Sequence, residues 1–133
     1  MRNTILGIAF LAIISTMLPA QSLQQRIEVA KKRVYPALVN ISVVTKTYSG
    51  GRAVRRPSAG SGTIISPAGH VITNYHVVQD AQRITCTLPS GEAIPADIIA
   101  DDPAIDMSML QLRLKERENP NVALPFATIG DSA

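Results

Sequence analysis

Two histidines and a few aspartates carry most of this chain's capacity for acid–base chemistry. His76 lies in the segment TNYHVV, residues 73–78, directly after the apolar run HVIT. A histidine becomes an effective general base when a carboxylate fixes its tautomer and stabilises its protonated form. The acidic residues are therefore the candidate partners of His76. The other histidine, His70, follows the turn-like PAG and is predicted to be an exposed turn residue.

Asp106 is the acid best placed to be that partner. It directly precedes the apolar run MSMLQL, so the backbone enters a core strand after it and the carboxylate lies at the rim of the fold. A carboxylate in that position is costly to bury unless a donor meets it, and His76 could be that donor. The remaining acids of this region occupy predicted exposed, strand or turn positions: Asp80, Asp97, Asp101 and Asp102.

Metal and cofactor chemistry are not indicated by the sequence. A zinc site needs three or four ligands, and the two histidines and Cys86 lack the spacing of a zinc motif. As the only cysteine, Cys86 cannot form an intrachain disulfide. Its place in the apolar-patterned RITCTL predicts a small buried side chain.

The segments that must position these residues are short and rich in β-branched side chains. Tight turns separate six predicted strands: 37–45, 61–66, 70–74, 83–88, 93–100 and 107–114. This spacing favours an all-β fold, either a closed antiparallel barrel or a sandwich, over an α/β arrangement. Residues 49–60, rich in Gly, Ser, Arg and Pro, are predicted to form a flexible loop.

The N-terminal third divides into a leader and a short helix. Arg2, the charge-free apolar run 4–18 and the ending LPA predict a signal peptide at 1–20, cleaved after Ala20. The run is shorter than the roughly 20 residues of a membrane-spanning helix, which favours a cleaved leader. An uncleaved N-terminal membrane anchor is the alternative. Residues 21–36 form a predicted amphipathic helix and linker, and 37–133 a single domain.

Charge is unevenly distributed along the chain. The stretch 21–60 carries eight Lys or Arg against Glu28 alone, whereas 61–133 carries four against nine acids. The basic clusters contain no interleaved aromatic residues for stacking on bases, so nucleic-acid binding is not expected. Arg52, Arg55 and Arg56 are predicted to lie in a solvated loop, but binding of the basic segment to anionic lipid remains an alternative.

GSGTIISPAGHVITNYHVV, residues 60–78, and DDPAIDMSMLQL, residues 101–112, together resemble the first half of a trypsin-like serine protease of the bacterial HtrA (Do-like) type. The resemblance implies that His76 is the general base, that Asp106 orients it, and that the domain is a six-stranded antiparallel barrel, the first of two. Met107 and Ser108 depart from the aliphatic residue and alanine favoured there. Val77 stands where animal digestive relatives have a disulfide-forming cysteine.

The resemblance also implies an activity and a setting. The implied activity is that of a serine endopeptidase that cleaves unfolded exported polypeptides. The full-length protein is expected to be a homo-oligomer. Its expected location is the periplasm or the outside of the cell, without stable membrane insertion after leader cleavage. In the family the nucleophile lies in a GNSGG-like loop after the Asp, which places it beyond Ala133. None of the candidate serines fits that loop: Ser61, Ser90, Ser108 and Ser132. We therefore expect these residues to be inactive alone; the alternative is a catalytically inactive binding or scaffold domain of the cell envelope.

Overall fold

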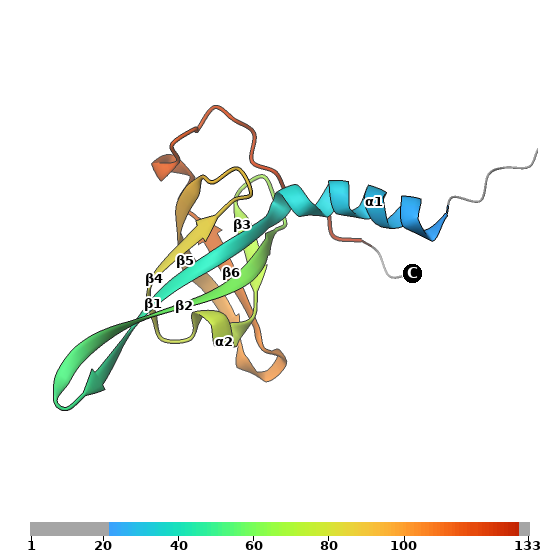
Figure 1. The fold of residues 1–133 in the computed structure, drawn as a ribbon. Coiled ribbons are helices and arrows are strands. Elements are labelled where there is room, and N and C mark those ends of the chain that lie inside the picture. The colour runs from blue at the N-terminus through green and yellow to red at the C-terminus, as the bar shows by residue number, and fades with distance from the viewer. Residues whose placement is uncertain (1–21, 131–133) are drawn as a thin grey trace, which may run out of the picture.

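The computed structural model describes residues 22–130, so the predicted signal peptide lies outside the described residues. Figure 1 shows a small barrel from which a helix and a long hairpin project. The helices are α1 (Leu23–Val34), η1 (Tyr35–Ala37), α2 (Tyr75–Val78), η2 (Pro103–Ile105) and η3 (Leu114–Glu116). The strands are β1 (Leu38–Ser49), β2 (Arg52–Ile64), β3 (His70–Thr73), β4 (Ala81–Thr87), β5 (Ala93–Asp102) and β6 (Met107–Leu112).

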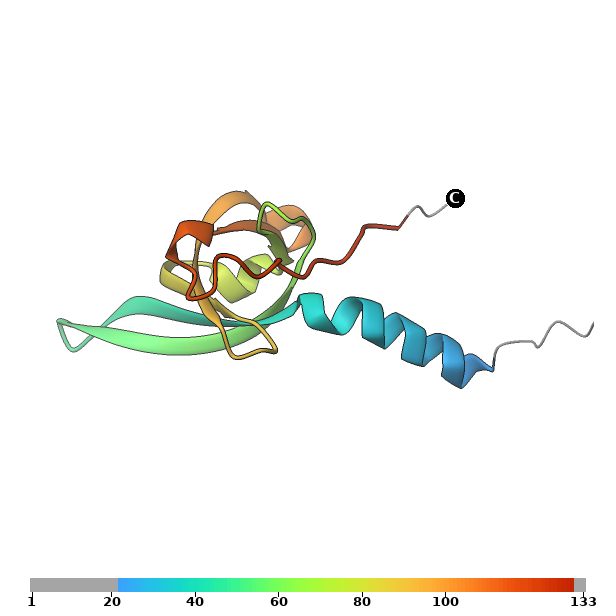
Figure 2. The same cartoon turned by 90° about the horizontal axis from the view of Figure 1, so that it is seen from above.

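The strands close into a barrel in the order β1-β2-β3-β6-β5-β4, and every neighbouring pair is antiparallel. The view from above in Figure 2 looks onto this ring. Alternate side chains of each strand fill its interior, as Val39, Ile41 and Val43 do on β1, because successive residues of a strand point to opposite faces. The predicted six-stranded antiparallel barrel is confirmed.

The prediction of a flexible loop at 49–60 is wrong. β1 and β2 pair without interruption from Leu38↔Thr63 to Ser49↔Arg52 and form a long two-stranded hairpin. Gly50 and Gly51 make its two-residue turn with φ values of 58° and 75°, the left-handed conformation that suits a tight hairpin. The arginines that the sequence placed in a loop therefore lie on a strand with a defined register.

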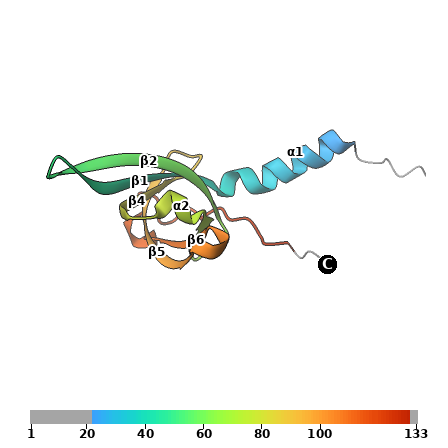
Figure 3. The same cartoon turned by 90° about the horizontal axis from the view of Figure 1, so that it is seen from below.

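The predicted short helix before the barrel is confirmed as α1. Ser22 caps it: its hydroxyl accepts from the Gln25 N–H while the Gln25 side chain accepts from the Ser22 N–H. None of its residues is buried, and Leu23 keeps 72% of its surface exposed. Figures 1 and 3 show α1 and the β1–β2 hairpin extending from the barrel in opposite directions. Within residues 22–130 no helix has the length and apolar character needed to cross a membrane.

A buried ion pair fastens the segment after β6 to the barrel. Arg117 donates to both carboxylate oxygens of Glu92, over 3.1 and 2.8 Å, and to the carbonyl of Val122 over 2.8 Å. The two charged side chains are only 5% and 7% exposed. Further along, the Ala127 N–H donates to the carbonyl of Ile64 on β2. This segment therefore packs against one end of the barrel and helps close it.

Candidate active site

His76 is positioned by the end of β3. Thr73, the last residue of this strand, is buried, and its hydroxyl donates to the carbonyl of Ser61 over 2.8 Å. The chain then turns through Asn74 into the single-turn helix α2, of which His76 is the second residue. The backbone around the histidine is thereby attached to β2 on one side and to the barrel core, through buried Val78, on the other.

Asp106 lies beside His76 because it precedes β6, the antiparallel neighbour of β3. β3 and β6 are antiparallel neighbours in which Thr73 faces Ser108. The residues that follow β3 and those that precede β6 must then lie at one end of the barrel. Asp106 has φ = 52°, a left-handed conformation that Asp and Asn tolerate better than most other side chains. It joins η2 to β6 and directs its carboxylate toward α2.

The two side chains form a hydrogen-bonded dyad. His76 Nδ1 lies 2.7 Å from Asp106 Oδ2, and the backbone N–H of His76 donates to Oδ1 over 2.9 Å. Asn74 adds a third donor group, because its Nδ2 lies 3.2 Å from both Oδ2 and the main-chain oxygen of Asp106. Asn74 is not among the candidate residues predicted from the sequence; its position between the strand and the histidine is the one sequence signal for this role.

These contacts also set the charge of Asp106. The backbone N–H of His76, followed by its ring N–H, holds the pKa of the Asp106 carboxyl below its usual value. The carboxylate is therefore ionised at neutral pH and accepts a hydrogen bond from Nδ1–H, which leaves Nε2 without a proton and able to act as a base. The histidine side chain is 67% exposed, and no hydrogen bond within residues 22–130 involves Nε2. The arrangement presents an oriented imidazole base to the outside.

The second histidine has a different environment. The exposed turn position predicted for His70 is wrong: it is the first residue of β3, is half-buried, and has Nδ1 2.7 Å from the Ser66 hydroxyl.

Ser108, which departs from the family pattern, is buried on β6, and its hydroxyl donates to Asp101 over 2.5 Å. Asp101 and Asp102 end β5, and the turn begins only at Pro103.

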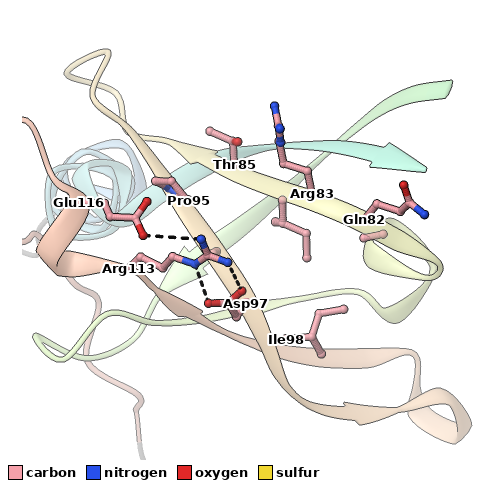
Figure 4. Close-up of a pocket in the computed structure, with 11 residues that line it drawn as sticks. Gln82, Arg83, Thr85, Pro95, Asp97, Ile98, Arg113 and Glu116 are labelled. Atoms are coloured by element: carbon pink, nitrogen blue, oxygen red, sulfur yellow. Dashed lines mark hydrogen bonds and ion pairs between the residues drawn. The ribbon is translucent and has the colours of Figure 1, made fainter. Parts of the chain in front are cut away.

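One hollow adjoins the dyad, and a larger one lies elsewhere on the barrel. A hollow of about 380 Å³ is lined by Asn74 and Asp106 together with apolar Leu38, Ile105 and Met107. A larger one of about 630 Å³ lies over β4 and β5 (Figure 4), where Arg113 is bonded to Asp97 and Glu116. Arg113, Asp97 and Glu116 are paired with one another there and neither member of the dyad lines it, so the candidate active site is the first hollow. The described residues contain no cluster of three potential metal ligands.

Comparison with known proteins supports one family. Residues 60–133 match the trypsin-like peptidase domain. Over 77% of the chain, 35% of residues are identical to those of the mitochondrial serine protease HTRA2 of Bos taurus, and over 55% of it, 41% are identical to a probable periplasmic serine endoprotease DegP-like of Chlamydia muridarum. The matched regions make up 21% and 13% of those relatives, so the chain spans about a fifth of their length or less.

A solved structure gives the same result at the level of the fold. The HtrA-type protease AlgW, solved with a decapeptide, superposes with a TM-score of 0.59 and 26% sequence identity over 77% of this chain and 35% of that one. The relatives and the fold agree. The chain therefore belongs to the trypsin-like peptidase family and, within it, to the HtrA type.

Proposed function

We propose that the protein to which this chain belongs is a serine endopeptidase in which His76 is the general base and Asp106 orients it. The observation that carries the proposal is the 2.7 Å contact between Nδ1 and the carboxylate, with the second carboxylate oxygen held by the histidine's own N–H. This double attachment fixes both the tautomer and the plane of the ring. A structural histidine at a strand end requires neither.

The proposed mechanism uses Nε2 of His76 as the base. Nε2 would take the proton of a serine hydroxyl as its oxygen attacks the peptide carbonyl, and would return that proton to the leaving amine when the C–N bond breaks. Asp106 would stabilise the imidazolium between these steps through the short Nδ1–H bond. Water then attacks the acyl-enzyme with the same base, which completes hydrolysis and restores the serine.

The serine itself is proposed to come from residues after Ala133. Within residues 22–130 no hydrogen bond joins a serine hydroxyl to His76, and several hydroxyls have other partners, such as Ser66 with His70 and Ser108 with Asp101. Leu38, Ile105 and Met107 beside the dyad are 38%, 63% and 43% exposed. A second barrel packed over this apolar rim would bring the nucleophile and the oxyanion-hole amides to Nε2.

Substrate and setting are part of the same proposal. Several similar proteins are named as periplasmic serine endoproteases. We accordingly propose an exported enzyme that cleaves unfolded polypeptides and assembles as a homo-oligomer in its full-length form. A predicted leader at 1–20 supports export.

The test uses the complete gene product. Labelling by a fluorophosphonate probe and cleavage of an unfolded casein are measured for the wild type, His76→Ala and Asp106→Asn. We expect His76→Ala to abolish labelling and Asp106→Asn to lower turnover by about 10⁴, because the amide would hold the histidine in the wrong tautomer. Asp80→Asn is the matched control, because Asp80 is exposed, lies four residues from His76, and forms no ion pair in the described part of the chain.

Two results would contradict the proposal. If Asp106→Asn and Asp80→Asn behaved alike, the dyad would have no role in turnover. If the complete wild-type protein were neither labelled nor active, the barrel would be a binding or scaffold domain that kept the dyad without its use.

A further inference from the structure

Three cations share one outer face of the barrel. β4, β1 and β2 are consecutive in the ring, and the inward positions of β1 alternate with outward ones. On the outward side Lys46 faces Arg55 directly across the hairpin, and Val44 faces Arg83 of β4. We call the outward surface formed by Lys46, Arg55 and Arg83 the basic face.

An irregularity in β4 shapes a hollow within the basic face. The pairing of β1 with β4 shifts after Val44, so Gln82 is an extra residue between the partners of Val44 and Thr45. Such a bulge bends the strand and redirects side chains. Gln82, Arg83 and Arg55 line a hollow of about 280 Å³, and Val44 and Pro57 complete its lining. Two arginines and a glutamine thus line one small site.

No acidic residue accompanies the cations of the basic face on β1 and β2. The sequence contains no Asp or Glu between Glu28 and Asp80, and none of the three cations takes part in an ion pair in the described residues. Like charges directly opposite each other destabilise a hairpin, and Lys46 and Arg55 are such a pair. An external anion would remove this penalty.

The other half of the barrel has the opposite character. Asp97, Asp101 and Asp102 lie on β5, and Arg113 is neutralised there by Asp97 and Glu116. In Figure 4 Arg83 points away from that ion pair. Positive and negative charge therefore lie on different parts of the barrel, and an anionic surface would orient the barrel with its basic face toward that surface.

The hairpin adds an amphipathic tip to the basic face. Tyr48 is 71% exposed, and the ammonium of Lys46 lies 5.4 Å from the centre of its ring. Tyrosine favours positions where its ring contacts apolar groups and its hydroxyl contacts water, as at a membrane interface. Figures 1 to 3 show the hairpin projecting beyond the barrel, so its tip can meet an extended surface.

We propose that the basic face docks on the surface of an anionic phospholipid membrane. The hollow between Arg55 and Arg83 takes a headgroup phosphate, which suits the fork geometry of guanidinium groups. Tyr48 lies at the level of the headgroups, and Lys46 adds to the attraction. A nucleic acid fits this face less well, since Tyr48 is the one aromatic residue of β1, β2 and β4 and offers no series of stacking platforms.

The test is sedimentation of the 133-residue chain with vesicles. One set contains phosphatidylcholine alone, and the other phosphatidylcholine and phosphatidylglycerol in equal parts; the first reports any binding by the apolar leader. We expect stronger binding to the anionic set. Since each basic residue near such a surface contributes a factor of about five, Arg55→Gln with Arg83→Gln should lower the partition coefficient roughly thirtyfold.

The matched control removes the same charge from α1, by Arg26→Gln with Lys32→Gln. We expect this pair to lower binding far less, and Tyr48→Ser to weaken binding without changing its salt dependence. Equal losses for the two double variants would overturn the proposal, because net charge alone would then govern binding. So would equal binding to both vesicle sets, or tighter binding to a single-stranded oligonucleotide than to anionic vesicles.

Discussion

The Glu92–Arg117 pair allows a sharp test of how the end of the barrel is held. We consider Arg117→Met, which keeps the aliphatic stem and removes the charge. Glu92 would lose both of its side-chain donors and keep only the N–H of Asn119, at 3.3 Å. Its carboxylate is 7% exposed, so water cannot readily replace the guanidinium.

Removing one partner of a buried ion pair costs about 3–5 kcal/mol, because the remaining charge is left without compensation. We expect about 3 kcal/mol here, since the pair lies at the end of the barrel and not among its core residues. For a domain of this size that corresponds to a fall of roughly 10–15 °C in the unfolding midpoint. The loss is a large part of the 5–15 kcal/mol of a typical domain.

The effect must also depend on pH. Arg117, as the main cause, holds the pKa of Glu92 below its usual value in the folded protein. The pair therefore stabilises the wild type fully above the pKa of an unfolded Glu, about 4.3, and this contribution is lost as pH falls through the folded value. As pH falls below the unfolded value, the stability difference between the wild type and Arg117→Met should accordingly shrink, and it should disappear only below the folded pKa of Glu92.

The assays are thermal unfolding and urea unfolding, both followed by circular dichroism, as the chain has no tryptophan. Arg113→Met is the matched control: Arg113 makes an equally bidentate contact with Asp97, at 2.7 and 2.6 Å, but the two side chains are 48% and 53% exposed. Exposed pairs contribute little, so its midpoint should stay near the wild type. Equal shifts for the two variants, or a deficit of Arg117→Met that persists at low pH, would refute the reasoning.

Three further results are expected from buried positions. Burial raises the pKa of the Cys86 thiol to about 12, so Ellman's reagent at pH 8 should react only at the rate of unfolding; fast reaction in the native state would contradict this. Gly62→Ala should destabilise by about 1–3 kcal/mol in urea titrations, because the added Cβ would lie 2.9 Å from the Ile72 carbonyl oxygen; an unchanged midpoint would show that the strands separate freely. Ser108→Ala should cost less than about 1.5 kcal/mol, since exposed Asp101 regains water; a larger loss would mean that this bond holds β5 to β6.

Much of the fold could be predicted because strand periodicity is local. The β-branched run of β1 and the apolar run of β6 each encode one buried face, and six such runs with short turns leave few architectures. The hairpin was missed because its composition is that of a loop. Gly50 and Gly51 were the available signal, as a Gly-Gly pair between two potential strands favours a two-residue hairpin turn.

The candidate site, too, was predictable from the sequence only in part. His76 and Asp106 were identified from motif order and from the strand that follows the aspartate. The contribution of Asn74 and of the His76 N–H could not be derived, because both depend on the left-handed conformation of Asp106 and on the approach of α2 to it.

The sequence by itself determined which residues face the core, which acid precedes a core strand, and where the basic residues lie along the chain. Tertiary structure alone decided which of them meet. Asp106 reaches His76 across thirty positions because β3 and β6 are antiparallel neighbours, and Arg83 joins Arg55 because β4 pairs with β1 through a bulge. The physical reason is that periodicity specifies the face of each strand, whereas the partner of each strand is selected by the closure of the whole barrel around one core.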